Sequence, residues 1–461
     1  MSINNKLASH QQQKIQHYAQ NSDAYSFFNL LTSPELLSTV EALIPEHRER
    51  QFPPTETLSM FLAQALNQDR SCQKAVNDAA VKRLIGGLPL ISTATGGYCR
   101  ARQRLPLAVV SALARQTGQL IQGQIPAQWR WEDRQVYLID GTTVTMPDTQ
   151  ANQAAYPQQG GQKPGLGFPI CRLLGVTCLS SEAIVNASIG SFSGKGSDEQ
   201  TLLRNVLDTF MAGDCVLGDA FFGTYFLLNA LCNKGVDALF EQMGARKRVT
   251  DYRKGKRLGT KDHLLTLSKP KKKPDWMSPA YFESAPDSLV IRELHVGGKT
   301  LITTWLDPKE MPKPSLKALY KKRWQIEVDF RHIKTTLGME VLSCKTPEMV
   351  QKEIWIYFLA YNLIRLLMAQ SALLADVLAH HLSFKHCLQL WLAWGQQQAM
   401  NTDASKTLLF CLMAQRRVGQ RPGRVEPRAV KRRPKPMPLL MKTREEARAD
   451  IRKNGHTKKL K

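Results

Sequence analysis

The sequence predicts an α/β protein with an all-helical N-terminal region, a sheet-forming core that is interrupted once, and a basic C-terminal tail. Three observations support this prediction. Apolar residues recur at helical spacing up to about residue 130, whereas short strand-like runs alternate with helical patterns from Gln135 onward. Positive charge is concentrated in two segments of an otherwise nearly neutral chain. At 461 residues and 43% hydrophobic content, we expect about two or three domains.

Residues 1–130 are expected to be helical throughout. Apolar residues follow helical spacing at 58–66 and 75–84, and a third helix begins near Thr95. The third helix carries three arginines: Arg100, Arg102 and Arg104. Short helices, tight turns and arginines on the third helix resemble a helix-turn-helix DNA reader. A helical cap with solvated arginines explains the same pattern, so both interpretations stay open.

Residues 131–243 are expected to form the first part of the core, in the order strand, strand, strand, helix, strand, helix, strand. The apolar run Val136–Asp140 indicates a buried strand that ends in a carboxylate, and a second short strand ends in Asp219. A turn aspartate after a strand explains either residue alone. If the two strands are neighbours, the two carboxylates lie side by side.

The excess charge lies in a basic insertion and in a basic tail. In the insertion, residues 244–314, there are 12 basic and 2 acidic residues from Arg246 to Lys273, and strand-like runs occur at 289–294 and 300–306. The proline-rich tail, residues 416–461, has 17 basic and 4 acidic residues and is expected to stay extended or disordered until it binds a polyanion. The net charge of +24 favours a nucleic-acid partner.

Residues 315–415 return to the core, and their first helix is the most informative segment of the chain. At about 100° per residue, four polar residues fall within one arc roughly 60° wide. These residues are Tyr320, Arg323, Glu327 and Lys334. The adjacent apolar stripe consists of Leu319, Ile326, Phe330, Ile333 and Leu337. Such a polar row can bind a metal ion and phosphates. The ordinary alternative is an amphipathic helix whose charged edge is simply solvated.

Three carboxylates in this order of secondary structure suit a two-metal site for phosphoryl transfer. Hard divalent cations prefer oxygen ligands, and two ions about 4 Å apart activate the attacking oxygen and stabilise the leaving one. Asp140 and Asp219 at strand ends would face Glu327 on the covering helix. Four other acids are interpreted as caps, loop residues or solvated residues: Asp133, Asp148, Asp214 and Asp329.

Cysteine usage and the termini predict a reducing cytoplasm. The nine cysteines include no C-x-x-C pair, which argues against a disulfide framework and a zinc ribbon. The N-terminal residues show no apolar signal region. The apolar helix 353–375 is interrupted by Asn362, Arg365 and Gln370, so we expect a core helix and no membrane span.

These motifs resemble those of a DDE transposase of a bacterial insertion sequence, in the branch known as insertion sequence family 4. The spacing Tyr320, Arg323, Glu327, Lys334 matches the Y-(2)-R-(3)-E-(6)-K motif of that branch. Asp140-Gly-Thr is similar to its first-aspartate block, and Gly218-Asp219-Ala-Phe-Phe to its second. The resemblance extends from roughly residue 53 to residue 438.

The resemblance implies a ribonuclease H-like catalytic core with a β-rich insertion before the glutamate helix. It implies Mg²⁺-dependent cleavage at the ends of a mobile DNA and transfer of the 3′ hydroxyls into target DNA, with two ions that Mn²⁺ can replace. Asp140, Asp219 and Glu327 would be the metal ligands, while Tyr320, Arg323 and Lys334 would hold phosphate. The partners would be double-stranded DNA and a second subunit in a synaptic dimer, with the DNA ends passing through a hairpin.

Hairpin chemistry needs an aromatic pocket for a base that leaves the stack. Trp305 is the first candidate and Trp276 the second, although a tryptophan in a strand is more often a core residue. The glycine-rich loop at 160–167 lacks the spacing of a nucleotide-binding loop, so Lys163 and the loop backbone are expected to approach DNA phosphate. A plain hairpin connection is the alternative for this loop.

The sequence leaves three alternative functions. A related metal-dependent nuclease would cut without transferring strands. A domesticated, catalytically silent DNA-binding protein would recognise DNA ends without cutting, although it has no need for three converging acids. An RNA-binding protein is disfavoured because the chain lacks aromatic RNA-recognition motifs.

Overall fold

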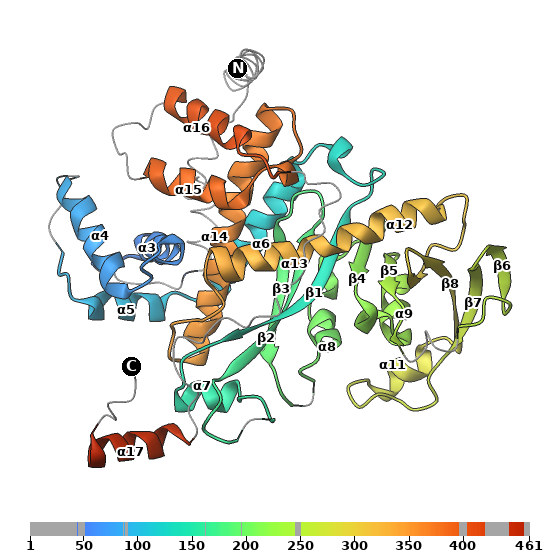
Figure 1. Cartoon of the computed structure of the whole chain (residues 1–461), viewed down its shortest axis with the longest axis horizontal. Helices are drawn as coiled ribbons and strands as arrows, with labels where there is room; N and C mark the ends of the chain where they lie inside the picture. The colour runs from blue at the N-terminus through green and yellow to red at the C-terminus, as the bar shows by residue number, and fades with distance from the viewer. Residues whose placement is uncertain are drawn as a thin grey trace.

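The centre of the molecule is a mixed nine-stranded sheet (Figure 1). The computed structural model describes residues 44, 51–85, 87, 91–161, 163–194, 196–244, 250–395, 403–419 and 442–455. Within them the strand order is β3-β2-β1-β4-β5-β9-β8-β7-β6. The strands are β1 (Val136–Thr145), β2 (Ile170–Cys178), β3 (Ile184–Ser191), β4 (Cys215–Gly218), β5 (Asp237–Glu241), β6 (Lys256–Gly259), β7 (Asp262–Ser268), β8 (Ser288–Val296) and β9 (Lys299–Thr303).

The two halves of the sheet differ in direction. Strands β1, β4 and β5 are parallel, and β2 and β3 continue antiparallel from β1. The basic insertion contributes β6 to β9, which are antiparallel to one another, and β9 pairs with β5. The insertion therefore extends the core sheet at its edge. The expected runs 289–294 and 300–306 correspond to β8 and β9, whereas the more polar β6 and β7 were not predicted.

Strand β1 does not end at Asp140, which corrects the prediction from the sequence. It continues to Thr145 because β2 pairs with it along almost its whole length, from Tyr137–Cys178 to Thr145–Ile170. The parallel neighbour β4 pairs only with residues 136–138. Asp140 therefore lies within β1, just beyond the last residue of β1 that pairs with β4.

Helices cover both faces of the sheet, and β1 shows why two cores form. Leu138 packs into the cluster under α6 (Leu107–Gln124), α13 (Gln325–Arg331) and α14 (Pro347–Leu374). The next residue, Ile139, points to the other face, where α8 (Glu199–Arg204) and α9 (Tyr225–Asn233) pack. Alternation along the strand thus divides the apolar residues between two layers of helices.

Helix α14 is a core helix, as predicted. It is long and apolar enough to span a membrane by length and composition, but 83% of its most apolar window is buried inside the protein. Its polar interruptions have internal partners. Asn362 Oδ1 accepts a hydrogen bond from Ile184 N (2.9 Å), and Asn362 Nδ2 donates to Ile184 O (2.7 Å), which ties the helix to β3.

The remaining described helices lie at the two ends of the chain and in connections. They are α3 (Pro54–Leu66), α4 (Cys72–Ile85), α5 (Thr95–Arg104), α7 (Gln150–Ala155), α11 (Pro279–Ser284), α12 (Lys313–Lys321), α15 (Phe384–Gly395), α16 (Asp403–Gln415) and α17 (Arg444–Asn454). Short 3₁₀ turns occupy Ala127–Trp129, Leu207–Thr209, Ala220–Phe222, Lys322–Trp324 and Ala379–His381. The described part of the N-terminal region is helical, as predicted.

The C-terminal tail is partly helical, which corrects the expectation for the residues that the structure describes. Thr443 and Glu446 form a capping box at the start of α17. Arg444 Nη1 lies 2.6 Å from Asp148 Oδ2, and its guanidinium carbon lies 4.2 Å from the centre of the Phe168 ring. The helix therefore docks against the segments on both sides of α7. Residues 420–441 and 456–461, which carry much of the predicted basic tail, lie outside the described residues.

Candidate active site

The segment expected to be one regular helix changes winding twice. Helix α12 leads through the 3₁₀ turn Lys322–Trp324 into α13, and a π-helical turn follows at His332–Thr336. In Figure 1 the rod formed by α12 and α13 crosses the sheet. The tighter and the wider turn offset each other, so the predicted apolar stripe stays on one face. All five of its residues are buried: Leu319, Ile326, Phe330, Ile333 and Leu337.

A glycine in β2 lets this rod approach the sheet closely. Gly175 is paired with Asp140 across the ladder between β2 and β1. A Cβ atom at Gly175 would lie 2.7 Å from Cζ of Phe330, much closer than the about 3.5–4.0 Å of an ordinary carbon contact. The Phe330 ring therefore rests directly on the strand beside Asp140. Glu327, one helical turn earlier, is held over the same part of the sheet.

The register of β1 and β4 places the two aspartates as neighbours. Leu138 is paired with Leu217, and Asp140 follows Leu138 by two residues, so its side chain points to the α13 face. Asp219 follows Leu217 by two residues and lies directly after the end of β4. Adjacent strands lie about 4.8 Å apart. Asp219 Oδ1 accepts a hydrogen bond from Phe221 N (2.8 Å) and so caps the turn after β4. The structure thus brings together the two aspartates that the sequence singled out.

Arg323 connects the sheet to the glutamate. Its Nη1 atom lies 4.0 Å from Asp140 Oδ2, and its Nη2 atom lies 2.8 Å from Glu327 Oε1. Lys334 Nζ donates to the Thr142 hydroxyl (3.2 Å), two residues beyond Asp140 on β1. Tyr320 is buried, and the loss of hydration raises its pKa. Four of the predicted residues therefore converge with their polar ends at one place: Asp140, Arg323, Glu327 and Lys334.

The electrostatics of the site are unfavourable to a further negative charge. Burial is the main cause that raises the pKa of Asp140 to about 7, and the charges of Asp219 and Glu199 raise it further. The Gly141 N–H and Arg323 act in the opposite direction. A cluster of carboxylates that raises the pKa of one member is suited to a bound cation.

Glu199 is a further acid beside the site, and no motif in the sequence singles it out. A Cβ atom at Gly141 would lie 2.1 Å from Glu199 Oε1, so this carboxylate fits against β1 directly beside Asp140. Arg172 Nε lies 4.0 Å from the same oxygen, and burial raises the pKa of Glu199. In the sequence, Glu199 is only an acid in the first turn of a helix, which is an ordinary position for it.

The donor types at the site fit a divalent metal ion, although the side chains are not arranged around one. Within the described part of the chain, no group of three or more Asp, Glu, His or Cys side chains is gathered closely enough to hold an ion. Carboxylate oxygens are the ligands that hard divalent cations prefer. Glu327 is paired with Arg323, and an ion would have to replace that guanidinium as its partner.

Asp329 is not a solvated or capping residue, which corrects the prediction. It is fully buried, and its Oδ1 accepts a hydrogen bond from Arg365 Nη2 at 3.0 Å. Arg365 also pairs with buried Glu182, and its Nε donates to Tyr361 Oη at 2.8 Å. This buried network fastens α13 to α14 and to the turn between β2 and β3. Asp214, by contrast, lies in a loop as expected and accepts a hydrogen bond from Met211 N at 2.7 Å.

Of the three arginines that were expected to contact DNA from the third helix, only two are exposed. Arg102 is 7% exposed, and its guanidinium carbon lies 4.8 Å from the Phe61 ring centre and 5.0 Å from that of Tyr98. It is therefore a core residue, which corrects the prediction. Arg100 and Arg104 are exposed and remain candidates for DNA contact.

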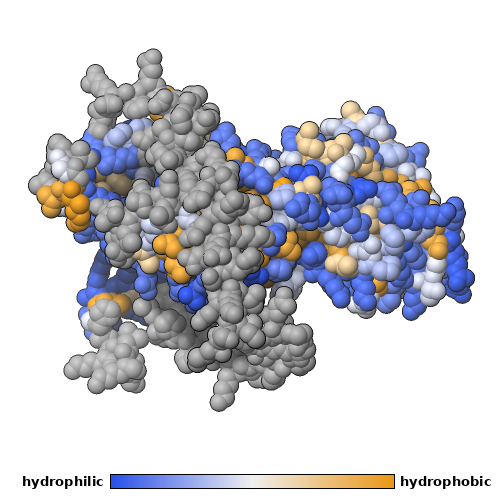
Figure 2. All heavy atoms as spheres, turned by 90° about the horizontal axis from the view of Figure 1, so that it is seen from above, coloured by the Kyte–Doolittle hydropathy of each residue, from blue (hydrophilic) through white to orange (hydrophobic). Residues whose placement is uncertain are grey.

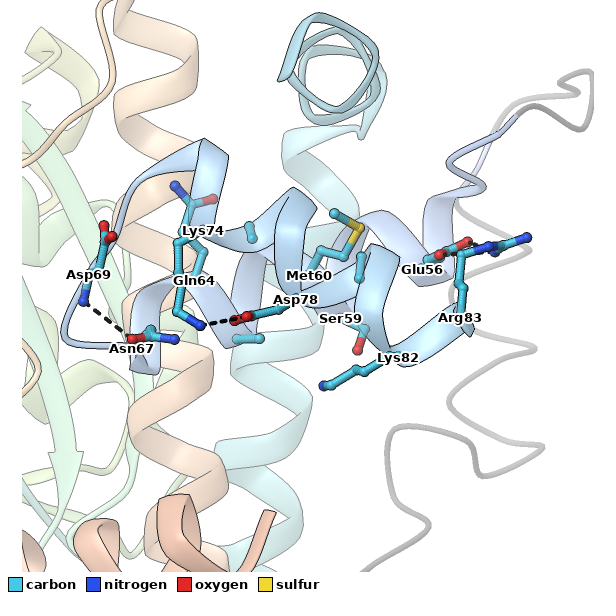
Figure 3. A pocket seen from close by; sticks show the side chains of 13 residues that line it. Glu56, Ser59, Met60, Gln64, Asn67, Asp69, Lys74, Asp78, Lys82 and Arg83 are labelled. Carbon is cyan, nitrogen blue, oxygen red and sulfur yellow. Dashed lines mark hydrogen bonds and ion pairs between the residues drawn. The ribbon is translucent and has the colours of Figure 1, made fainter. Parts of the chain in front are cut away.

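The pocket between α3 and α4 does not form a basic reading surface. As Figure 3 shows, acids and bases alternate along it. Glu56 is paired with Arg83 (3.3 Å) and Asp78 with Lys74 (2.5 Å), so its charges are largely balanced.

The prediction that Trp305 forms a pocket for a DNA base is also wrong. Trp305 is 3% exposed; its ring centre lies 6.0 Å from that of Trp131, and the Arg134 guanidinium carbon lies 5.7 Å from it. The ring therefore belongs to the core and offers no open face. Trp276, the second candidate, is 46% exposed. Lys163 is exposed on the loop after α7, beyond the far end of β1, and is not brought to the carboxylates.

The sequence comparisons agree with the motifs. Residues 131–363 match the family described as "Transposase DDE domain". The chain is 28% identical over 346 residues to the transposase InsG for insertion sequence element IS4 of Escherichia coli K12, covering 74% of this chain and 75% of that protein. A cryo-EM structure of the piggyBac transposase synaptic complex with hairpin DNA covers 88% of this chain and 87% of its own, with a TM-score of 0.43 and 9% identity.

Proposed function

The chain belongs to the DDE transposases of insertion sequence family 4, and from this premise we propose that it cuts the ends of a mobile DNA and joins them to target DNA at Asp140, Asp219 and Glu327. Membership of the family makes the chain a DNA-cleaving and strand-transferring enzyme that uses divalent metal ions. The observation that carries the residue assignment is the convergence of acids from β1, from the end of β4 and from α13 beside Arg323.

We assign a ribonuclease H-like core to residues 131–243 and 315–415, interrupted by the insertion 244–314. The order β3-β2-β1-β4-β5, with β1, β4 and β5 parallel and β2 antiparallel, supports this assignment. Asp219 lies at the carboxyl end of β4, and Asp140 lies beside it on β1. Ligands in open α/β sheets bind at the carboxyl ends of the strands. Residues 1–130 are assigned to DNA-end binding and residues 416–461 to binding along the phosphate backbone.

The carboxylates would hold two Mg²⁺ ions, for which Mn²⁺ would substitute. When bound, such ions activate the attacking oxygen and stabilise the leaving one. The protein's own contribution is to position the DNA phosphate and to neutralise its negative charge. Arg323 can donate two parallel hydrogen bonds to a phosphate, and this geometry is available once the guanidinium leaves Glu327. Lys334, held near β1 by Thr142, places a second cation on the same side.

In the view of Figure 2, the visible face of the lobe that contains the insertion carries mainly hydrophilic side chains, consistent with a DNA-facing role. A dimeric synapse and a hairpin intermediate belong to the proposal on the basis of family membership. The cytoplasm is the proposed compartment. The alternative, a silent DNA-binding protein, leaves unexplained why three half-buried acids converge and why one of them, Asp140, is held where its pKa is raised.

The test is strand cleavage of a duplex that spans one flank of the protein's own gene, in the presence of Mg²⁺. We expect the wild type and a Glu340→Gln control, in which an exposed acid outside the site is changed, to cut. Glu327→Gln is expected to bind the duplex with similar affinity and not to cut. Binding by all three proteins with cutting by none would support the silent alternative.

A further inference from the structure

The turn between α3 and α4 connects the N-terminal region to the end of the glutamate helix, which is α13 with its π-helical turn. Arg70 lies in this turn, and its Nη1 atom donates a hydrogen bond to Gly338 O at 2.8 Å. The φ angle of Gly338 is +85°, in the left-handed region that favours glycine. A Cβ atom at this position would lie only 1.8 Å from Arg70 Nη2. The guanidinium group therefore occupies the space that any other side chain at residue 338 would need.

The backbone around Gly338 is bonded to the residues that carry the site. Glu340 N donates a hydrogen bond to Lys334 O (3.2 Å), which ties the segment back onto the π-helical turn. Glu340 O accepts a hydrogen bond from Thr145 N (3.2 Å) at the end of β1. Arg70 holds the same segment from the side of the N-terminal region. Because these bonds join residues 334–340, a shift of Gly338 would displace Lys334.

The turn that carries Arg70 is also bonded to α5, the helix with the exposed arginines. Gln64 Nε2 donates to Arg70 O (2.7 Å), and Gln64 Oε1 accepts a hydrogen bond from Tyr98 Oη on α5 (2.8 Å). Within the turn, Asn67 Oδ1 accepts a hydrogen bond from Asp69 N (3.2 Å), the dashed line between these two residues in Figure 3. A connected series of hydrogen bonds thus runs from α5 through this turn to the end of the glutamate helix.

We propose that Arg70 is a positioning residue for DNA cleavage, and that its contact with Gly338 couples the N-terminal region to the glutamate helix. The proposal rests on the proposed function, in which residues 1–130 bind the DNA end and Lys334 holds a phosphate. Arg70 acts on the reaction through the position of Lys334. A DNA end that seats correctly on the N-terminal region would thereby align the site for cutting, which favours cleavage at the correct end.

The experiment measures single-turnover cleavage and, without divalent cation, binding of the duplex that spans one flank of the gene. We expect Arg70→Ala to slow cleavage by about 10- to 100-fold, since a misplacement of about 1 Å costs about 100-fold, and to leave binding unchanged. Arg70→Lys keeps a donor for Gly338 O and should restore part of the rate. The matched control is Arg134→Ala, which removes another half-buried arginine that bridges Asp237 (3.4 Å) and Glu310 (2.6 Å). Because Arg134 precedes β1 at the end away from Thr145, this control should cut at the wild-type rate.

A double-mutant cycle distinguishes positioning from a general loss of stability. If Arg70 acts through Lys334, adding Arg70→Ala to Lys334→Ala should change the rate by less than about threefold, because residues that act as a unit are not additive. Equal fold losses in the two backgrounds would overturn the proposal. So would an unchanged rate of Arg70→Ala, or a loss of DNA affinity as large as the loss of rate.

A second readout does not depend on cleavage. Hydrogen exchange of the backbone amides in residues 334–342 is followed by mass spectrometry. We expect exchange in Arg70→Ala to be about 10-fold faster than in the wild type, as for loss of one hydrogen bond from a charged donor, and exchange in Arg134→Ala to be unchanged. Binding of the duplex should slow this exchange in the wild type and not in Arg70→Ala. An effect of DNA that is equal in the two proteins would refute the coupling.

Failure of this inference can be told apart from failure of the proposed function. If Glu327→Gln still cuts DNA while Arg70→Ala cuts slowly, the assignment of the catalytic acids fails and the positioning role of Arg70 stands. If cleavage depends on Glu327 but neither cleavage nor hydrogen exchange depends on Arg70, the positioning role alone is refuted.

Discussion

The close approach of α13 to the sheet depends on Gly175, and this dependence can be measured. In Gly175→Ala, the new methyl group would lie 2.7 Å from Cζ and 3.0 Å from Cε1 of Phe330. An ordinary contact needs about 3.5–4.0 Å, so the ring and its helix must move by about 1 Å. Overpacking of this kind costs about 1–3 kcal/mol. At about 2.1 cal/mol/K per residue, the unfolding entropy of 461 residues is about 1 kcal/mol/K, so we expect a fall in melting temperature of about 1–3 °C.

The same displacement should reduce activity more than stability alone explains. A misplacement of about 1 Å in an active site costs about 100-fold in rate, and Phe330 lies one helical turn from Glu327. The assay is the rate of strand cleavage at saturating DNA, together with thermal unfolding. We expect Gly175→Ala to cut about 100-fold more slowly at temperatures where it remains folded.

The matched control is Gly190→Ala on the adjacent strand β3. Its methyl group would lie 2.8 Å from Leu202 Cδ2, on the sheet face away from α13. Leu202 lies one helical turn from Glu199, which is not one of the three assigned metal ligands, so we expect a similar loss of stability with a smaller loss of rate. In addition, Phe330→Leu should partly restore the rate of Gly175→Ala, with a coupling of about 0.5–3 kcal/mol between the two changes. Normal cleavage by destabilised Gly175→Ala, or additive effects of the two changes, would refute the reasoning.

Three further predictions concern the charges of the site. Because burial raises the pKa of Asp140 to about 7, its ionised form destabilises the folded metal-free chain as the pH rises from about 4 through about 7. Asp140→Asn should therefore raise the melting temperature at about pH 8 and change it little at about pH 4; an equal effect at both would contradict the pKa shift. Arg365→Leu leaves Glu182 and Asp329 buried without their cation and should cost about 3–5 kcal/mol in urea unfolding, whereas a loss below about 1 kcal/mol would show that the network is not structural. Arg323→Lys keeps the charge but loses the paired hydrogen bonds, so single-turnover cleavage should slow by about 10- to 150-fold, and an unchanged rate would remove Arg323 from the phosphate site.

The glutamate helix was predictable because its function and its packing leave separate periodic patterns. The apolar stripe through Phe330 and Ile333 is buried as predicted, and the polar row beside it converges on Asp140. The changes of winding on either side of α13 were not predictable, because they depend on how the segment fits the sheet. The end of β1 was misplaced for a similar reason, since the pairing with β2 that continues the strand past Asp140 involves residues far along the chain.

The residues whose positions were predicted wrongly or not at all depend on contacts between distant segments of the chain. Arg102, Asp329 and Arg365 are charged, and a charged residue on a helix is usually solvated. Each is buried here because a partner from another segment meets it, as Asp329 meets Arg365 from a helix 36 residues later. Glu199 reaches the site only because Gly141 leaves room for its carboxylate. Such partners are properties of the tertiary fold and have no local signal in the sequence.

The most direct test of the central claim is a crystal structure of the chain with a DNA end and Mn²⁺, with the ions located by anomalous scattering. We predict anomalous peaks in contact with the carboxylates of Asp140, Asp219 and Glu327, and Arg323 turned from Glu327 toward a DNA phosphate. Peaks elsewhere, or a Glu327 that remains paired with Arg323 while DNA is bound, would contradict the assignment of these three acids as the metal ligands.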